Sequence, residues 1–487
     1  MTPPGDEAGP RVARLLQQSL SLVLLCAWLS LLVQLRVLMG SHGLSPAAHW
    51  VEALSVAKIG FWAYPSWLRI TGASDTIMFA GVWLGIALAL FGTAGKFVRV
   101  GLFLQAPLYL GLTLAGGTFF HFQWDQLFVE SAVLVALLPR DRRSSLALFL
   151  VRALLFKLYF ESGIAKAESH LGDWWNGSAM THYYETAPLP ASLAYWMHTL
   201  PRGWHHLESW VTLGLELGLP CLFFVPKRRI RLVAALALTG FQILNWATAN
   251  YGFFVPLAVV LHLSLVGERD VARLGDWLRR RLRRPTYQPE NAHPRRSVTV
   301  ALGVFAAAWL SASTVEALDD FAGLTGPLMP VRRLYLPFQL FNTYHLFGHI
   351  TIDRIEPELQ TTDDDITWTA HPLRYQPADP RGPLQRASPH QPRVAFQMWF
   401  YGLAPQRTPL WVRALVDHVC NEPATVESLF MAPLPPHPKA VRLVFWKSQF
   451  STPDDRRATG MLWTRTLQDQ TNPVICDTQN AAEAEGS

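Results

Sequence analysis

Ionisable side chains lie inside an apolar stretch of helix length near the middle of the chain. The run SSLALFLVRALLFKLYFESGIAK contains Arg152, Lys157 and Glu161. Charge within hydrocarbon is energetically unfavourable, so an ionisable residue at that depth marks a functional hypothesis. Lys157 and Glu161 are one helical turn apart and can therefore share one face of a helix.

Two interpretations of these charges stay open. In the first, Lys157, Glu161 and Glu130 form a buried ion-pair network that fixes the register of neighbouring helices. In the second, Lys157, Glu161 and His182 are the catalytic candidates of a membrane-embedded enzyme and perform acid–base chemistry. An enzyme needs these groups within hydrogen-bond reach of one cavity, whereas a scaffold needs them only paired with each other.

Other polar residues of the same region are expected to line a vestibule that opens away from the cytoplasm. They come from neighbouring apolar runs and from the loops that join them. The predicted vestibule consists of His121, Gln123, Asp125, Glu130, Arg152, Tyr183, Tyr184, Glu185, Glu216 and Asn245.

Established cofactor and catalytic motifs are missing from the sequence. It contains no GxGxxG fingerprint followed by an acidic residue, no Walker loop, no HExxH, no GxSxG and no CxxC. His205 and His206 are adjacent, so a helix cannot present both imidazoles on one face. We therefore expect no metal and no cofactor.

The composition is typical of a membrane protein. Of 487 residues, 50% are hydrophobic and only 16% are charged, whereas soluble domains are about 25% charged. A helix needs roughly 20 apolar residues to cross a bilayer. About nine runs are candidates, near 18–38, 76–95, 99–119, 126–139, 145–164, 207–226, 231–247, 252–267 and 298–315.

The positive charges define the orientation of these runs. The formal net charge is +6, and the basic residues form five short clusters that flank apolar runs. Nine alternating spans put all five clusters on one side, which the positive-inside rule identifies as the cytoplasm. This distribution also argues against nucleic-acid binding. The first run lacks a cleavage site and is expected to be a retained anchor.

The region after the last apolar run has short alternating segments and many prolines. The stretches at 348–360 and 363–376 predict a hairpin with an acidic turn, and those at 393–403 and 440–452 predict further strands. A short amphipathic helix is expected at 409–420, and an extended loop at 372–393. Cys420 and Cys476 both fall in this outer region and are expected to form a disulfide.

These features predict an α-helical polytopic membrane protein of about nine spans with a C-terminal extracytoplasmic β-rich domain. We expect a division into a cytoplasmic N-terminus at 1–17, a transmembrane domain at 18–315 with an outer loop at 166–206, an outer domain at 316–480 and a disordered tail at 481–487.

Several long motifs, in order along the chain, resemble the lipase maturation factor family of membrane proteins. The resemblance covers roughly residues 60–475. Its motifs are HFQWDQLFVE at 121–130, VRALLFKLYFESGIAK at 151–166, GDWWNGSAMTHYYETAPLP at 172–190, YWMHTLP at 195–201, FQILNWATANYGFF at 241–254, FQLFNTYHLFGHITIDRIE at 338–356 and PHQPRVAFQMWFYGL at 389–403.

The resemblance implies a membrane-anchored factor for the folding and assembly of secreted proteins, by analogy lipases. Its partners would be the lipid bilayer and a secreted client, and exposed aromatic residues, above all Trp174 and Trp175, would contact that client. Animal members reside in the endoplasmic reticulum membrane. The Ala- and Arg-rich composition looks bacterial, and a bacterial member would lie in the cytoplasmic membrane and face the periplasm.

Two other functions remain as alternatives. A weaker likeness in general layout points to vitamin K-dependent carboxylase-like proteins, which would make the chain an enzyme that uses its buried ionisable residues. A structural membrane subunit would instead co-purify with a fixed partner at a fixed ratio.

Overall fold

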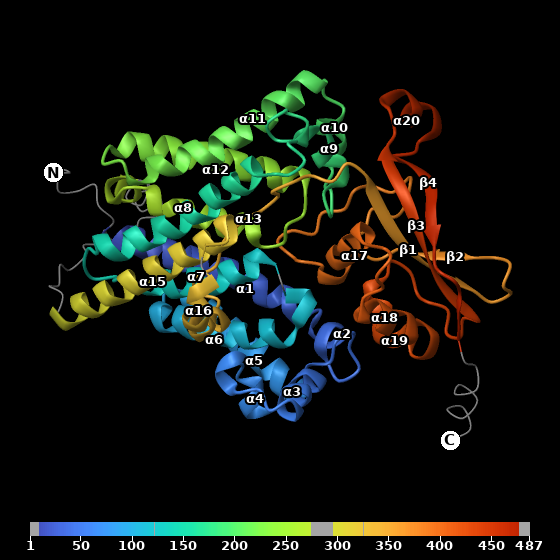
Figure 1. Ribbon diagram of the computed structural model, residues 1–487, viewed down its shortest axis with the longest axis horizontal. Helices are drawn as coiled ribbons and strands as arrows, with labels where there is room; N and C mark the ends of the chain where they lie inside the picture. Colours follow the sequence, from blue (N-terminus) through green and yellow to red (C-terminus); the bar gives the residue numbers. More distant parts are fainter. Residues whose placement is uncertain (1–8, 121, 274–295, 325, 477–487) are drawn as a thin grey trace, which may run out of the picture.

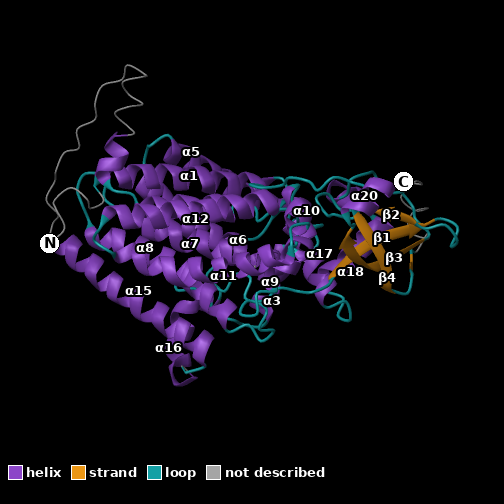
Figure 2. Cartoon of the chain, turned by 90° about the horizontal axis from the view of Figure 1, so that it is seen from above, coloured by secondary structure: helices purple, strands orange, loops and turns teal. Residues whose placement is uncertain are grey.

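The computed structural model describes residues 9–120, 122–273, 296–324 and 326–476. Long helices fill one end of the molecule, and a small sheet with short helices forms the other (Figure 1). Helix α15 (Arg296–Ala322) lies along the outside of the bundle, and α16 (Met329–Tyr335) projects from its end (Figure 2).

Six helices of the described residues are long and apolar enough to cross a membrane. Their lengths suit the roughly 30 Å hydrocarbon core at about 1.5 Å of rise per residue. They are α1 (Pro10–Leu32), α5 (Asp75–Thr93), α6 (Val98–Ala115), α11 (Arg202–Gly218) continued by η3 (Leu219–Phe224), α12 (Arg228–Thr248) and α15 (Arg296–Ala322). The protein is therefore an integral, multi-pass membrane protein.

Three further helices coincide with the remaining predicted spans. Helix α7 (Gln123–Ala136) begins inside the HFQWDQ motif, and α13 (Phe254–His262) is also short. Helix α8 (Ser145–Ala167) has 23 residues but contains Arg152, Lys157, Glu161 and Lys166. It packs in the interior of the bundle against α7, α11, α13 and α15. The count of nine spans stays a prediction.

Short helices connect the long ones. The aromatic segment at 61–70 forms two single turns instead of a span. The connecting elements are α2 (Leu35–Met39), α3 (Ala47–Val56), η1 (Phe61–Ala63), α4 (Leu68–Thr71), η2 (Gly117–Phe120), α9 (Ala179–Thr186), α10 (Leu193–His198), η4 (Leu263–Leu265), η5 (Gly326–Leu328), α16 (Met329–Tyr335) and η6 (Leu336–Phe338).

The outer region contains an antiparallel sheet with the order β2-β1-β3-β4, and β5 pairs with the start of β3. Its central pair joins Arg354 to Ser448 at one end and Thr362 to Ala440 at the other. The predicted hairpin at 348–376 and the strand at 440–452 are confirmed. The strands are β1 (Arg354–Thr362), β2 (Thr369–His371), β3 (Ala440–Phe450), β4 (Trp463–Gln470) and β5 (Val474–Ile475).

One predicted strand is wrong, because residues 393–403 form the helix α17 (Arg393–Leu403). Its buried residues Val394, Ala395, Met398 and Tyr401 recur with the spacing of a helix face. The apolar residues Val394, Phe396, Met398 and Phe400 recur at every second position, as in a strand, and packing against β1 decides for the helix. The other helices of this region are α18 (Leu410–Asn421), as predicted, α19 (Pro423–Val426), η7 (Glu427–Leu429) and α20 (Pro453–Thr459).

A disulfide joins Cys420 at the end of α18 to Cys476 after β5. It closes a loop across 56 positions of sequence and thereby ties the last strand to a helix on the sheet. Cys26 and Cys221 lie in the bundle as free thiols.

Candidate functional site

Lys157 and Glu130 form an ion pair in the interior of the bundle. Lys157 Nζ lies 3.5 Å from Oε1 of the fully buried Glu130. Glu130 also accepts hydrogen bonds from Trp309 Nε1 at 3.1 Å and from the Tyr344 hydroxyl at 2.6 Å. Lys157 Nζ donates to the hydroxyl of Ser313 at 3.0 Å. The pair therefore connects α7 and α8 to α15 and to the chain that follows α16.

The outer end of α8 holds the segment 342–350, which leads from the bundle to the first strand. Glu161 Oε2 accepts a hydrogen bond from the backbone N–H of Tyr344 at 2.9 Å. The Ser162 hydroxyl accepts one from the backbone N–H of Leu346 at 3.2 Å. Glu161 and Ser162 thus accept backbone N–H groups of the segment 342–350, which passes over α8, and hold that segment in place.

Lys166 closes the same end of α8. Its Nζ donates to the carbonyl of Leu346 at 2.7 Å and forms an ion pair with Glu216 of α11 at 2.7 Å. The ammonium also lies 5.2 Å from the ring centre of Trp174, within cation–π range. Lys166 thus joins α8, α11, the loop after α8 and the connecting segment at one point.

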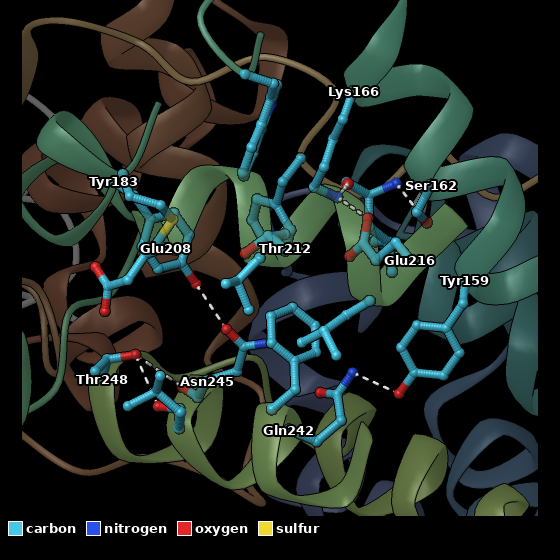
Figure 3. A pocket seen from close by; sticks show the side chains of 18 of the residues that line it. Tyr159, Ser162, Lys166, Tyr183, Glu208, Thr212, Glu216, Gln242, Asn245 and Thr248 are labelled. Carbon is cyan, nitrogen blue, oxygen red and sulfur yellow. Dashed lines mark hydrogen bonds and ion pairs between the residues drawn. The ribbon is translucent and has the colours of Figure 1, made fainter. Parts of the chain in front are cut away.

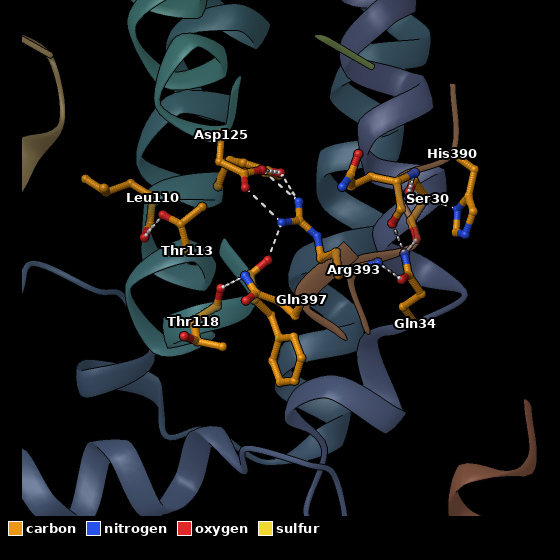
Figure 4. Close-up of polar contacts among 12 residues, drawn as sticks. Ser30, Gln34, Leu110, Thr113, Thr118, Asp125, His390, Arg393 and Gln397 are labelled. Atoms are coloured by element: carbon orange, nitrogen blue, oxygen red, sulfur yellow. Dashed lines mark hydrogen bonds and ion pairs between the residues drawn. The ribbon is translucent and has the colours of Figure 1, made fainter. Parts of the chain in front are cut away.

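The outer region is anchored in the bundle by a buried ion pair between Arg393 and Asp125 (Figure 4). The guanidinium donates to both carboxylate oxygens, at 2.8 and 2.7 Å. It also donates to the Phe119 carbonyl at 2.6 Å and to the Tyr109 hydroxyl at 3.0 Å. Two parallel hydrogen bonds to one carboxylate fix the orientation of an arginine, so this contact sets where α17 begins.

Helix α1 supports the residues before Arg393 (Figure 4). The Ser30 hydroxyl lies 3.0 Å from His390 Nδ1, and Gln34 Nε2 donates to the Gln391 carbonyl at 2.8 Å. Gln34 Oε1 accepts the backbone N–H of Arg393 at 2.9 Å. The backbone polar groups that open α17 are therefore satisfied by side chains at the end of α1 and in the turn that follows it.

The loop between α8 and α11 is bound to the sheet by Arg354. The guanidinium donates to the carbonyls of Ala187 at 2.5 Å and Pro188 at 3.1 Å. It also forms an ion pair with Glu356 at 2.6 Å. At the other end of the loop, Asp173 Oδ2 accepts the backbone N–H of Ile350 at 2.9 Å. The loop and the sheet thus form one connected body on top of the bundle.

A cavity of about 220 Å³ lies among α8, α9, α11 and α12, and we call it the bundle cavity (Figure 3). Polar residues in its wall are mostly paired with each other. Gln242 Nε2 donates to the Tyr159 hydroxyl at 2.9 Å, and the Tyr184 hydroxyl donates to Glu208 at 3.0 Å. The remaining wall is largely aliphatic and aromatic, including Leu158, Met180, Leu215, Phe241, Leu244 and Phe254.

A second cavity of about 310 Å³ lies where the bundle meets the outer region, and we call it the junction cavity. Its wall is rich in aromatic rings from α7 and α17, namely Trp124, Phe396, Trp399 and Phe400, with Phe122 just before α7. Aromatic side chains offer large apolar contact area at a low cost in conformational entropy. This cavity can therefore accept apolar side chains of another molecule.

Tyr183, Leu346 and Phe347 line both cavities and form the wall between them. The Phe347 ring lies 5.9 Å from Tyr183 and 4.9 Å from Tyr251, centre to centre. Phe347 has a φ of +56°, in the left-handed region that bulky residues adopt only under constraint. The hydroxyls of Tyr183 and Tyr251 are 2.8 Å apart. The wall is thus held by packing and by a hydrogen bond.

The structure divides the predicted vestibule. Tyr183, Tyr184, Glu216 and Asn245 line the bundle cavity, and Gln123 lines the junction cavity. The other described members lie in neither wall and serve as internal contacts. Asp125 binds Arg393, Glu130 binds Lys157, Arg152 donates to the Ser264 carbonyl, and Glu185 accepts the backbone N–H of Phe450. His121 lies outside the described residues.

The three catalytic candidates do not meet at either cavity. Lys157, Glu161 and His182 are absent from the walls of both, in the part of the chain that the structure describes. Lys157 and Glu161 are occupied by the contacts given above, and His182 lies on α9, half-buried.

The two tryptophans predicted to contact a client differ in exposure. Trp174 is only 2% exposed and packs beside Lys166, so it cannot offer a contact surface. Trp175 is 60% exposed, and its Nε1 donates to the Ala167 carbonyl at 2.7 Å. Trp174 and Trp175 are adjacent in a turn, and their side chains point in opposite directions, which the sequence alone does not reveal.

Lys166, Ser162, Arg393 and Phe347 were missed as site residues. Ser162 and Lys166 follow Glu161 in the motif ESGIAK and are four positions apart, a spacing that places both on one helix face and is a usable signal. Arg393 has no local signal, because Asp125 lies 268 positions earlier in the chain.

Below pH 6.5, His198 is expected to lower the stability of the outer loop. Burial, with smaller contributions from His205 and His182, lowers the pKa of His198 to about 4 from 6.5. Between these values the unfolded state binds the proton and the folded state does not, so stability falls as pH falls. The full effect is on the order of 3 kcal/mol, at 1.36 kcal/mol per pKa unit.

The measurement is the thermal midpoint of wild type and His198→Gln in detergent between pH 7 and about pH 4. The variant should lose less stability over this range. Identical slopes for the two proteins would contradict the assignment.

A bundle of apolar helices, with an antiparallel outer sheet and its helices docked on it by a buried ion pair and by hydrogen bonds, defines a polytopic helical membrane protein with a β-containing domain. The model of the lipase maturation factor transmembrane domain matches residues 11–273, and that of the lipase maturation factor C-terminal domain matches 340–473. The chain belongs to the lipase maturation factor family.

Its relatives cover most of its length. Lipase maturation factor 2 of Homo sapiens is 27% identical over 599 residues, which cover 96% of this chain and 83% of the relative. Lipase maturation factor 1 of Bos taurus is 26% identical over 500 residues, which cover 92% of this chain and 86% of the relative. No solved structure matches the chain. The carboxylase-like alternative gains no support from these matches.

Proposed function

We propose that the protein is a membrane-anchored maturation factor that assists the folding and assembly of secreted lipases. The observation that carries this proposal is the match of both family domains, in order, to residues 11–273 and 340–473. The relatives at 27% and 26% identity are named lipase maturation factors and are covered over more than four fifths of their length.

The outer region is proposed to lie outside the cytoplasm. Basic residues beside the ends of several apolar helices contact one another or the neighbouring chain at one end of the bundle. Arg14 donates to the Arg140 carbonyl at 3.4 Å, Arg140 to the Gly95 carbonyl at 2.8 Å, and Arg228 to Asp270 at 2.8 Å. By the positive-inside rule this end faces the cytoplasm. A count of nine spans agrees with that orientation, with the transmembrane domain beginning at residue 18, the outer domain at 316 and the tail at 481.

The compartment follows from the host. In a eukaryote the outer region would face the lumen of the endoplasmic reticulum, and in a bacterium the periplasm. Both environments preserve disulfides such as Cys420–Cys476.

We assign client contact to the mouth of the junction cavity. Phe400 is 43% exposed at its rim; its ring stacks on Phe122 and meets Trp399 edge to face. Leu403, one turn further along α17, is also exposed. Exposed apolar side chains around a cavity are typical of a binding site for partly folded protein.

The function is tested by deleting and restoring the gene in its own host. Secreted lipases should be present in normal amounts in the deletion strain but with low specific activity, and the intact gene should restore that activity. Unchanged amount and activity in the deletion strain would exclude lipases as clients.

The contact site is tested by restoring the gene as the double variant Phe400→Ser, Leu403→Ser. We expect at least about a tenfold loss of client association, since each buried apolar side chain contributes about 1.5–3 kcal/mol. Leu410→Ser is the matched control, because Leu410 is an exposed leucine on α18 outside the junction cavity. Equal loss in the control, or no loss in the double variant, would contradict the assignment.

A further inference from the structure

The bundle cavity opens through the outer surface of two transmembrane helices. Among its lining residues, Val211 of α11 is 47% exposed and Gly240 of α12 is also exposed. Both helices have the length and composition of membrane spans. Apolar residues beside this mouth, such as Leu207 and Ile243, are exposed as well. In a bilayer the mouth therefore faces lipid and not water.

Glycine keeps the mouth open on the α12 side. A Cβ atom added at Gly240 would have no other heavy atom within 4 Å. Side chains elsewhere on the same helix face are large, including Phe241 and Leu244 in the cavity wall. The gap at Gly240 is thus a feature of the entrance that a single larger side chain can close.

The wall of the bundle cavity contains a buried hydrogen-bond acceptor and a buried hydrogen-bond donor that both lack partners. Gln242 is 2% exposed, and its Oε1 has no hydrogen-bond partner in the structure. In Figure 3 its nitrogen donates to Tyr159 and its oxygen points away from that residue. If the amide nitrogen and oxygen of Gln242 were placed the other way round, the group without a partner would be a donor instead of an acceptor. Trp174 Nε1, in the same wall, is a buried donor without a partner.

Buried polar groups without partners are costly, by roughly 1–3 kcal/mol each. A ligand that supplies a donor to Gln242 and an acceptor to Trp174 would remove that cost. The charges in the wall require no ionic ligand, because Lys166 and Glu216 neutralise each other at 2.7 Å and Glu208 is bound by the Tyr184 hydroxyl and by His205 Nδ1. The fitting ligand is therefore uncharged, with at least one hydrogen-bond donor and one acceptor, as hydroxyl and ester groups provide.

The size and lining of the cavity favour a hydrocarbon chain. Apolar cavities of about 150 Å³ accommodate benzene, and this cavity measures about 220 Å³. It can hold part of an acyl chain, while the rest of the chain extends through the mouth into the bilayer. We propose that the bundle cavity is a binding site for an uncharged, single-chain membrane lipid with hydroxyl and ester groups, of the monoacylglycerol class. The proposal does not depend on the identity of the client.

The test uses the full-length protein in phosphatidylcholine nanodiscs with a monoacylglycerol that carries a diazirine and an alkyne on its acyl chain. After irradiation, labelled peptides are mapped by mass spectrometry. We expect labelling on α11 and α12 around Val211 and Gly240, and we expect excess unlabelled monoacylglycerol to compete it away.

Gly240→Leu should reduce this labelling about tenfold, which corresponds to roughly 1.4 kcal/mol. Gly303→Leu on α15 is the matched control, because a Cβ there also meets no atom within 4 Å. Val211→Trp closes the mouth from the other helix and keeps the test valid should Gly240→Leu fail to fold. Gln242→Leu should weaken competition by monoacylglycerol while the cavity stays open.

Equal labelling of Gly240→Leu and wild type would overturn the proposal, because the probe would then be reporting ordinary surrounding lipid. Equal competition by lysophosphatidylcholine would also overturn it, since that lipid has a single chain but a zwitterionic headgroup that does not suit the cavity. Loss of labelling in both closing variants, with labelling retained in Gly303→Leu, would support it.

Discussion

Replacing Arg393 by Ala is expected to destabilise the folded protein by about 3–5 kcal/mol, because it leaves a buried carboxylate without its counterion. Asp125 is fully buried and receives two hydrogen bonds from the guanidinium, at 2.8 and 2.7 Å. Truncation also removes the donors to the Phe119 carbonyl and the Tyr109 hydroxyl. The side chains on α17 that line the junction cavity would lose their anchor as well.

The measurement is the thermal midpoint of the detergent-solubilised protein, with size-exclusion chromatography to report loss of the folded monodisperse species. Arg407→Ala is the matched control, since Arg407 is exposed shortly after α17. The double variant Arg393→Met, Asp125→Leu should recover part of the lost stability, because an apolar pair of similar volume often replaces a buried ion pair at little cost. An unchanged midpoint for Arg393→Ala would contradict the anchoring role.

Much of the architecture could be predicted from the sequence because the bilayer imposes a simple rule. A spanning helix must satisfy its own backbone and present apolar side chains, so α1, α5, α6, α12 and α15 are visible as apolar runs. The hairpin of β1 and β2 was also predictable, because strand alternation and an acidic turn are local signals.

Helix α17 was not predictable by the same reasoning. Its sequence satisfies strand alternation and helical spacing about equally, and the deciding contacts are with β1, Asp125 and α1. Tertiary packing overrides local pattern in such segments. Tertiary contact also explains Trp174 and Trp175, whose neighbouring side chains differ between 2% and 60% exposure.

The candidate site was predicted as a set of residues but not as an arrangement. Tyr183, Tyr184, Glu216 and Asn245 do line one cavity. Asp125 and Glu130, by contrast, have partners more than 25 positions away along the chain, in α8 and α17. No periodicity within a helix encodes such pairs, because any buried carboxylate of a span can equally face a cavity or a cation.

The pair formed by Lys157 and Glu130 allows the structural and enzymatic interpretations to be separated by experiment. Lys157→Met alone should destabilise the protein by about 3–5 kcal/mol, because Glu130 then lacks its only counterion among the contacts seen here. Glu130→Gln alone should cost a similar amount, because it leaves the ammonium of Lys157 buried at 3.5 Å from a neutral amide. Both losses are measured as thermal midpoints in detergent, with Lys58→Met, an exposed lysine, as control.

The double variant Lys157→Met, Glu130→Gln removes both charges and keeps one acceptor oxygen, which can serve the Tyr344 hydroxyl, while Trp309 Nε1 still donates to the Leu340 carbonyl. If the pair is structural, stability and lipase maturation should both return close to wild type, and the two single effects should be strongly non-additive. If Lys157 is an acid–base catalyst, the double variant should be stable but inactive. The contacts of Lys157 with Ser313 and with the faces of Trp309 and Tyr344 occupy its ammonium on several sides. We therefore expect the double variant to support maturation, because an ammonium enclosed by its own protein has no room for a substrate.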